Sequence, residues 1–173
     1  MFNTFAELVA ASQSYLTLYD DFIARHALIL SVIADHICFK CHSSHEYEHV
    51  RAVLERDPPS RYSYQVWLAG RRVAYLGFRV GLPLKSSSIM CIELADAKPF
   101  GREAGGFHHL EIYPTRISYD DLLMKLEREG ERPILKMRPH HTTHDIVCSN
   151  GFTIRLTDRP LIKKIVDEEL SKS

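Results

Sequence analysis

Histidine and acidic side chains recur in this sequence at positions that could bind a metal ion. The segment Asp35-His36-Ile37 is matched later in the chain by His108-His109-Leu110, and Ile92-Glu93-Leu94 is matched by Ile154-Arg155-Leu156. Two imidazoles and one carboxylate that meet in a cleft bind Fe(II), Mn(II), Zn(II) or a similar ion and leave positions open for water or substrate. If these segments come together, the predicted metal ligands are His36, Glu93 and His109.

The elements around these segments follow one order twice: a strand, a helix and three strands. In the first half, alternation and helical periodicity predict strands at 33–41, 61–68, 72–80 and 89–95, with a helix ending near 56. In the second half they predict strands at 107–113, 133–137, 142–149 and 152–157, with a helix ending at 130. Serine capping signals at Ser43 and Ser118 open the two helices. The shared order indicates an internal duplication.

The repeat sets the expected organisation of the whole chain. We predict an N-terminal helical extension at 1–28, a first βαβββ module at 29–95, a linker at 96–106 and a second module at 107–158. Apolar residues at three- and four-residue steps across 3–26 predict one long helix or two short ones. Residues 159–173 are expected to form a C-terminal helix. The fold class is α+β, with the two modules forming one barrel-like cleft.

Convergence of the candidate residues follows from the geometry of two open sheets. Two modules related by a pseudo-twofold axis place equivalent strands on either side of a shared cleft. Side chains on a strand point alternately to its two faces. If His36 faces the cleft, the side chains expected beside it are Cys38, Lys40, Cys91, Glu93, His109, Glu111, Tyr113, Thr153, Arg155 and Thr157.

Three segments of the chain carry a family resemblance. The stretches DHICFKCH (35–42), CIEL (91–94) and GGFHHLEIYP (105–114) resemble the YecM family of bacterial proteins. The duplicated module is similar to the vicinal-oxygen-chelate superfold, which includes glyoxalase-type isomerases, extradiol dioxygenases and antibiotic-resistance proteins. The resemblance covers roughly residues 30–160. It implies a divalent metal ion in the cleft, with Fe, Mn, Zn and Ni not distinguished.

The resemblance also exposes a departure from the pattern of the superfold. Its enzymes draw ligands from the first and last strands of both modules, which here carry His36, Glu93, His109 and Arg155. A guanidinium stays charged and has no lone pair for a metal, so Arg155 cannot be the fourth ligand. Two alternatives follow. Either Arg155 binds the negative charge of a substrate beside the ion, or it replaces the ion and pairs with Glu93 in a non-catalytic binding protein.

The preferred hypothesis is a metal-dependent enzyme of isomerase, dioxygenase or lyase type, acting on a small anionic or oxygen-rich molecule. Glu111 or His144 would move the proton, because a carboxylate near the ligands or an imidazole at the cleft rim can act as acid or base. The side chains expected to contact the substrate are Arg155, Cys38 and Tyr113.

Two short motifs have competing interpretations. Residues 38–42 match the haem-attachment string C-x-x-C-H, but strand geometry puts the two sulfurs on opposite faces, which favours two buried thiols. Residues 45–49 match the metalloprotease string H-E-x-x-H. There Glu46 is better explained as the capping acid of the helix, so a protease remains a minor alternative. His140 and His141 are expected in a solvent-exposed turn.

Composition excludes several classes of partner. The 22 basic and 22 acidic residues balance, so the chain offers no electrostatic footprint for nucleic acid or an anionic membrane. No apolar run has the length of a membrane span. The first residues lack a basic region typical of an export signal, and four cysteines are too few for a disulfide scaffold, so we expect reduced thiols and a cytoplasmic location. A homo-oligomer, in which the edges of the predicted hairpins pair two chains, is left open.

Overall fold

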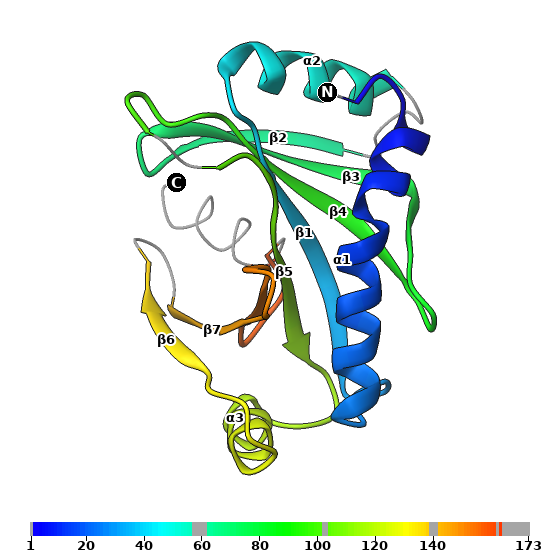
Figure 1. Ribbon diagram of the computed structural model, residues 1–173, viewed down its shortest axis with the longest axis vertical. Helices are drawn as coiled ribbons and strands as arrows, with labels where there is room; N and C mark the ends of the chain where they lie inside the picture. Colours follow the sequence, from blue (N-terminus) through cyan, green and yellow to red (C-terminus); the bar gives the residue numbers. More distant parts are fainter. Residues whose placement is uncertain (1, 57–61, 102–103, 139–141, 162, 164–173) are drawn as a thin grey trace.

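A single curved sheet forms the centre of the computed structural model (Figure 1), which describes residues 2–56, 62–101, 104–138, 142–161 and 163. The sheet has eight strands in the order β2-β3-β4-β1-β5-β8-β7-β6. The first four strands in this order belong to one βαβββ module and the last four to the other, so the predicted duplication and α+β class are confirmed. Strands β2 and β6 lie at the two ends of the sheet.

Each module begins with the strand that meets its counterpart at the centre. The first module comprises β1 (Val32–Lys40), α2 (Ser44–Arg56), β2 (Tyr62–Leu68), β3 (Arg71–Pro83) and β4 (Ser88–Ala95). The second comprises β5 (Gly106–Pro114), α3 (Tyr119–Arg128), β6 (Ile134–Met137), β7 (Thr142–Val147) and β8 (Thr153–Leu156). Strand β3 extends three residues beyond the predicted end at 80. The expected C-terminal helix lies largely outside the described residues.

Helix α1 (Phe5–Arg25) is one continuous helix, which resolves the alternative left by its sequence. Thr4 caps it, since its hydroxyl accepts a hydrogen bond from the backbone N–H of Glu7 at 3.1 Å. Its apolar stripe is buried, and even Ser12 in that stripe is satisfied by donating to the carbonyl of Val9. The helix lies along the sheet and packs against β3 and β5 (Figure 1).

All three helices cover the same face of the sheet, which leaves the other face for the site. Helix α2 packs against β3 and β4, and α3 against β5. The core between helices and sheet contains Leu8 and Leu16 of α1 together with Ile37 of β1 and Leu110 of β5. Side chains at alternate strand positions therefore point to the opposite, concave face.

The register of the central strands repeats when the two modules are exchanged. In the antiparallel β1–β5 pair, His36 lies opposite Glu111 and His109 lies opposite Cys38. The parallel pairs next to it match in the same way. Glu93 of β4 lies beside Cys38, and Arg155 of β8 lies beside Glu111. The equivalence of His36 with His109, and of Glu93 with Arg155, is thus confirmed.

Two β-bulges interrupt the central pair symmetrically. One register shift falls between Ala34 and His36, and the other between Cys38 and Phe39 opposite the segment that contains His108. A bulge adds one residue to a strand and lets two successive side chains turn toward the same face. It therefore brings Asp35 next to His36, and His108 next to His109, on the concave side.

Both predicted helix caps are present. The backbone N–H of Glu46 donates to the Ser43 hydroxyl, and that of Asp121 donates to the Ser118 hydroxyl, each at 3.1 Å. In addition, the carboxylate of Glu46 accepts from the backbone N–H of His42 at 2.6 Å. In the described part of the chain, no helix is both long and apolar enough to cross a membrane.

The packing of α1 generates a stability prediction. Leu16 is fully buried in the core, so Leu16→Ala should lower the free energy of unfolding by about 2–5 kcal/mol through lost burial and the cavity left behind. Ser14 is exposed two positions away on the same helix, and Ser14→Ala should change it by less than about 0.5 kcal/mol. Denaturant unfolding measures both, and equal effects would show that α1 is not anchored as described.

Candidate metal and anion site

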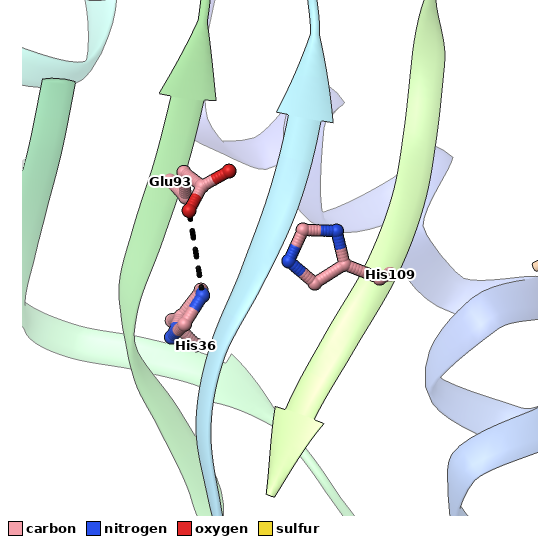
Figure 2. Close-up of side chains that lie close together, drawn as sticks. All are labelled: His36, Glu93 and His109. Carbon is pink, nitrogen blue, oxygen red and sulfur yellow. Dashed lines mark ion pairs between the residues drawn. The ribbon is translucent and has the colours of Figure 1, made fainter. Parts of the chain in front are cut away.

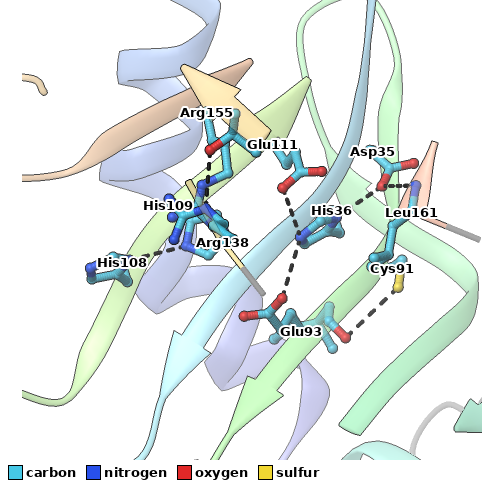
Figure 3. Close-up of polar contacts among 12 residues, drawn as sticks. Asp35, His36, Cys91, Glu93, His108, His109, Glu111, Arg138, Arg155 and Leu161 are labelled. Carbon is cyan, nitrogen blue, oxygen red and sulfur yellow. Dashed lines mark hydrogen bonds and ion pairs between the residues drawn. The ribbon is translucent and has the colours of Figure 1, made fainter. Parts of the chain in front are cut away.

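His36 is the centre of the site and the most unusual side chain in it. Its ring is 1% exposed, and Nδ1 lies 2.9 Å from Asp35 Oδ2. Nε2 is buried and has no hydrogen-bond partner among the described residues, although Glu93 Oε2 and Glu111 Oε2 lie 3.7 and 3.9 Å away (Figure 3). Burial lowers the pKa of His36, but the three surrounding carboxylates outweigh burial and raise it above its usual value. This corner of the cleft therefore favours a cation.

Glu93 reaches the same corner from the neighbouring strand β4. Burial raises the pKa of Glu93, but His36, a hydrogen bond from the Cys38 thiol and the charge of Arg155 together lower it below the usual value. Cys38 is fully buried, and burial next to Glu93 raises the pKa of its thiol. Cys38 therefore stays protonated beside the Glu93 carboxylate.

His109 faces His36 from strand β5, with the two ring centroids 5.8 Å apart (Figure 2). Its Nε2 lies 2.7 Å from Nη1 of Arg155, and its Nδ1 lies 3.0 Å from Nδ1 of His108. Arginine only donates, so His109 Nε2 must accept this hydrogen bond with its lone pair. Burial and the Arg155 charge lower the pKa of His109 well below the usual range, which keeps the ring neutral.

Asp145 holds Arg155 in this position. Arg155 is 6% exposed, and its Nε donates to Asp145 Oδ1 at 3.0 Å. Arg138 donates from Nη2 to the other oxygen of Asp145 at 2.8 Å and from Nε to Thr143 at 3.0 Å. Burial raises the pKa of Asp145, but the two guanidinium groups outweigh burial and lower it. The carboxylate that pairs with Arg155 is therefore Asp145.

A hollow on the concave face is lined by Glu93, His109 and Arg155, whereas His36 is not among the described residues that line it. Its volume is about 160 Å³, smaller than the roughly 300–1,000 Å³ of pockets for drug-sized ligands. Among the described residues, Glu93 and Glu111 supply its acidic lining. Its basic lining comes from Lys40, Arg71, Arg138 and Arg155. The excess of basic groups favours a small anionic ligand, and Glu111, 2% exposed, lies at the boundary between the basic and acidic parts.

The donor set fits a divalent ion at His36 and Glu93. Ligand atoms of His36, Glu93 and His109 all lie within 4.8 Å of one another. The 3.7 Å between His36 Nε2 and Glu93 is close to the ~3.4 Å between two ligands of a tetrahedral ion with bonds of about 2.1 Å. Asp35 on Nδ1 is the kind of carboxylate partner that orients metal-binding histidines. His109 can act as a third ligand through Nε2 only when Arg155 no longer donates a hydrogen bond to that atom.

Two predicted site residues lie elsewhere. His144 contacts the hydroxyl of Tyr119, the first residue of α3, at 2.9 Å, on the helix-covered face of β7. Asp145, the next residue, takes the cleft face instead because side chains alternate along the strand. His144 is thus not brought to the site. Tyr113 lines a neighbouring hollow with Cys91 and Asp35.

The two short motifs have structural roles where they are described. Cys38 and Cys41 are both free and buried, with Cys41 in the helix-facing core and Cys38 on the cleft side. His49 lies 2.9 Å from the backbone carbonyl of Phe2, and Glu46 is engaged as the helix cap. His140 and His141 lie outside the described residues.

Sequence reasoning missed the groups that surround the predicted ligands. Simple alternation along the strand puts Asp35 on the face opposite to His36, and only the bulge turns it toward His36. Asp145 and Arg138 were not singled out. Asp145 lies opposite Arg155 in the sheet, just as Tyr75 lies opposite Glu93 in the first module. This equivalence between the modules is the signal that could have identified Asp145.

The two βαβββ modules and their shared concave face have the architecture that the resemblance to the vicinal-oxygen-chelate superfold implies. The YecM protein family model matches residues 5–138, so the chain belongs to the YecM family. Structural genomics protein EC4020 is similar, with 16% identity, a TM-score of 0.71, and coverage of 94% of this chain and 92% of that chain. A likeness at this identity shows a shared fold.

A more distant likeness is to methylmalonyl-CoA epimerase from Mycobacterium tuberculosis. It has 17% identity and a TM-score of 0.49, and it covers 83% of this chain and 99% of that chain. None of the curated proteins matches the sequence.

The Asp145 pairing predicts an acid-sensitive part of the stability. Asp145→Asn should lower the free energy of unfolding at pH 7 by about 2 kcal/mol, because it leaves Arg155 buried with a neutral partner. A lowered carboxyl pKa stabilises the fold above the unfolded value of about 3.9, and this contribution is lost as pH falls below about 4. The loss caused by the substitution should therefore shrink at low pH.

Denaturant unfolding from pH 7 down to pH 3 measures this effect. The control is Asp158→Asn, which alters a carboxylate with 58% of its side chain exposed beside Arg159. An exposed pair contributes little, so its effect should stay under about 1 kcal/mol. A constant difference between wild type and Asp145→Asn across this pH range would contradict the proposed pairing.

Proposed function

We propose that the protein is a metal-dependent enzyme of the vicinal-oxygen-chelate type, acting on a small anionic molecule with two adjacent oxygens. His36, Glu93 and His109 would hold a divalent ion. The ion, when bound, supplies Lewis-acid stabilisation of negative charge on the substrate oxygens. The observation that carries the proposal is the buried Nε2 of His36, which faces two carboxylates and has no hydrogen-bond partner in the part of the chain that the structure describes. Leaving such a group unsatisfied is costly unless a ligand completes it.

The other cleft residues have distinct roles in this proposal. Arg155, fixed by Asp145, binds negative charge on the substrate, as the basic lining of the hollow supports. Glu111 moves the proton, because its carboxylate lies 3.9 Å from Nε2 of His36 and the residue lines the hollow. Asp35 orients His36, and Cys38 positions Glu93. Tyr113 would contact only a substrate that extends into the neighbouring hollow.

One observation favours a second candidate, a non-catalytic protein that binds small anions without a metal. In that case the bond between Arg155 and His109 is permanent, and the guanidinium supplies the positive charge of the cleft. The partner of Arg155 would then be Asp145, rather than Glu93 as expected from the sequence.

Metal content separates the two candidates. Full-length protein without a histidine tag, incubated with Mn²⁺ or Zn²⁺ and freed of unbound ion, should retain one ion per chain by elemental analysis. His36→Ala and His109→Ala should each weaken retention by at least tenfold, because removing even a partner of a ligand costs about 10–100-fold. His144→Ala should retain the ion, since His144 lies on the other face of its strand.

A wild-type protein that binds neither ion, with thermal stability unchanged by chelator or added metal, would support the metal-free candidate. Equal losses in His144→Ala and His36→Ala would indicate binding outside the cleft.

A further inference from the structure

Arg155 and a metal ion at this site would both require the lone pair on Nε2 of His109. The Nη1 of Arg155 donates to His109 Nε2 at 2.7 Å, and that nitrogen is the ring atom directed toward His36 and Glu93 (Figure 2). A neutral imidazole has one lone pair in the ring plane for either a hydrogen bond or a metal. The Arg155–His109 bond and metal coordination by His109 Nε2 are therefore mutually exclusive.

The guanidinium is built into this position. Asp145 binds Arg155 through Nε and is itself held by Arg138 and by a hydrogen bond of 3.4 Å from Thr143. Arg155 is 6% exposed, and its guanidinium stays charged because an arginine side chain does not deprotonate in proteins. When an ion takes the His109 lone pair, the charged Nη1 group remains in the cleft and needs another acceptor.

An oxyanion on the ion would supply that acceptor. Carboxylates make charge-assisted hydrogen bonds with guanidinium groups. A small dicarboxylate that chelates an ion through one oxygen of each carboxylate would keep its other oxygens available to a neighbouring donor. The hollow is lined by Arg155 and Arg138 on one side and by Glu93 on the other, within about 160 Å³. The space and the charge distribution both suit a small chelating carboxylate.

We infer that Arg155 competes with the metal ion for His109, and that the site consequently binds a divalent ion and a small chelating carboxylate together. The inference rests on the proposed function and specifies its ligand class. The ion removes the hydrogen-bond acceptor of Arg155, and the carboxylate provides a new acceptor. Binding of the two ligands is therefore thermodynamically coupled. Such coupling is reciprocal, so each ligand strengthens the binding of the other by the same factor.

Metal titration with oxalate as the probe tests this inference. Binding of Mn²⁺ to full-length protein is measured with and without oxalate at free-ion concentrations fixed by a metal buffer, which corrects for chelation in solution. In the wild type, oxalate should strengthen Mn²⁺ binding by roughly tenfold or more, the range of one hydrogen bond to a charged group. Arg155→Met should bind Mn²⁺ alone roughly tenfold more tightly and lose the oxalate effect.

Arg138→Met is the matched control. It removes the same charge from the same hollow, but the contacts of Arg138 are to Asp145 and Thr143 rather than to His109. It should therefore retain most of the oxalate effect and a weaker gain in Mn²⁺ affinity than Arg155→Met. Circular dichroism and thermal unfolding establish whether each variant is folded. The effect of oxalate on Mn²⁺ binding is also measured in the wild-type protein, so that part of the test does not depend on the folding of any variant.

The outcomes separate this inference from the proposed function. Mn²⁺ binding that oxalate leaves unchanged in the wild type, or an equal gain in both arginine variants, would overturn the competition while leaving the metal site intact. Absence of Mn²⁺ binding in the wild type and in Arg155→Met, with or without oxalate, would overturn both.

Discussion

The antiparallel pairing of β1 with β5 is the constraint from which the site follows. It joins the two modules at the centre of the sheet and sets His36 opposite Glu111 and His109 opposite Cys38. Residues 73 positions apart in the chain thereby face each other across 5.8 Å between ring centroids. Neither module alone can form this site, because each contributes one histidine. The helix-covered face supplies the packing that keeps this pairing rigid.

The two bulges in that pair differentiate the halves of the cleft. In the first module the bulge gives His36 a carboxylate neighbour, Asp35, whereas in the second it gives His109 an imidazole neighbour, His108. Carboxylates thus surround His36 and favour a cation. Burial of the His109 ring and the charge of Arg155 lower the pKa of His109 and keep that ring neutral. The duplicated backbone therefore carries carboxylates around His36, which suit a cation, and a guanidinium group beside His109, which suits an anion.

Most of this asymmetry comes from one pair of equivalent positions, where the first module has a glutamate and the second has an arginine. Glu93 and Arg155 occupy equivalent positions next to the central pair, yet they carry opposite charges. Their neighbours have changed to match: Tyr75 lies opposite Glu93, whereas Asp145 lies opposite Arg155 and neutralises it. Without Asp145, a guanidinium at 6% exposure would be a buried charge without a carboxylate partner.

Much of this arrangement was predictable from the sequence because the repeat is local and periodic. The paired motifs around His36 and His109 and the alternation of their strands were enough to predict the modules, the cleft and the convergence of His36, Glu93 and His109. Features that depend on long-range register were not. The phase of β7 decides that Asp145 rather than His144 enters the cleft, and strand periodicity alone does not fix that phase. The bulge that reorients Asp35 breaks the alternation on which the prediction relied.

The central claim is that one divalent ion binds where His36, Glu93 and His109 meet. Anomalous diffraction from crystals grown with Mn²⁺ and oxalate tests it most directly. A single strong peak at bonding distance from His36 Nε2, Glu93 and His109 Nε2, with Arg155 turned from His109 to the oxalate, is the predicted result. A peak elsewhere, or an intact Arg155–His109 hydrogen bond with no peak in the cleft, would contradict it.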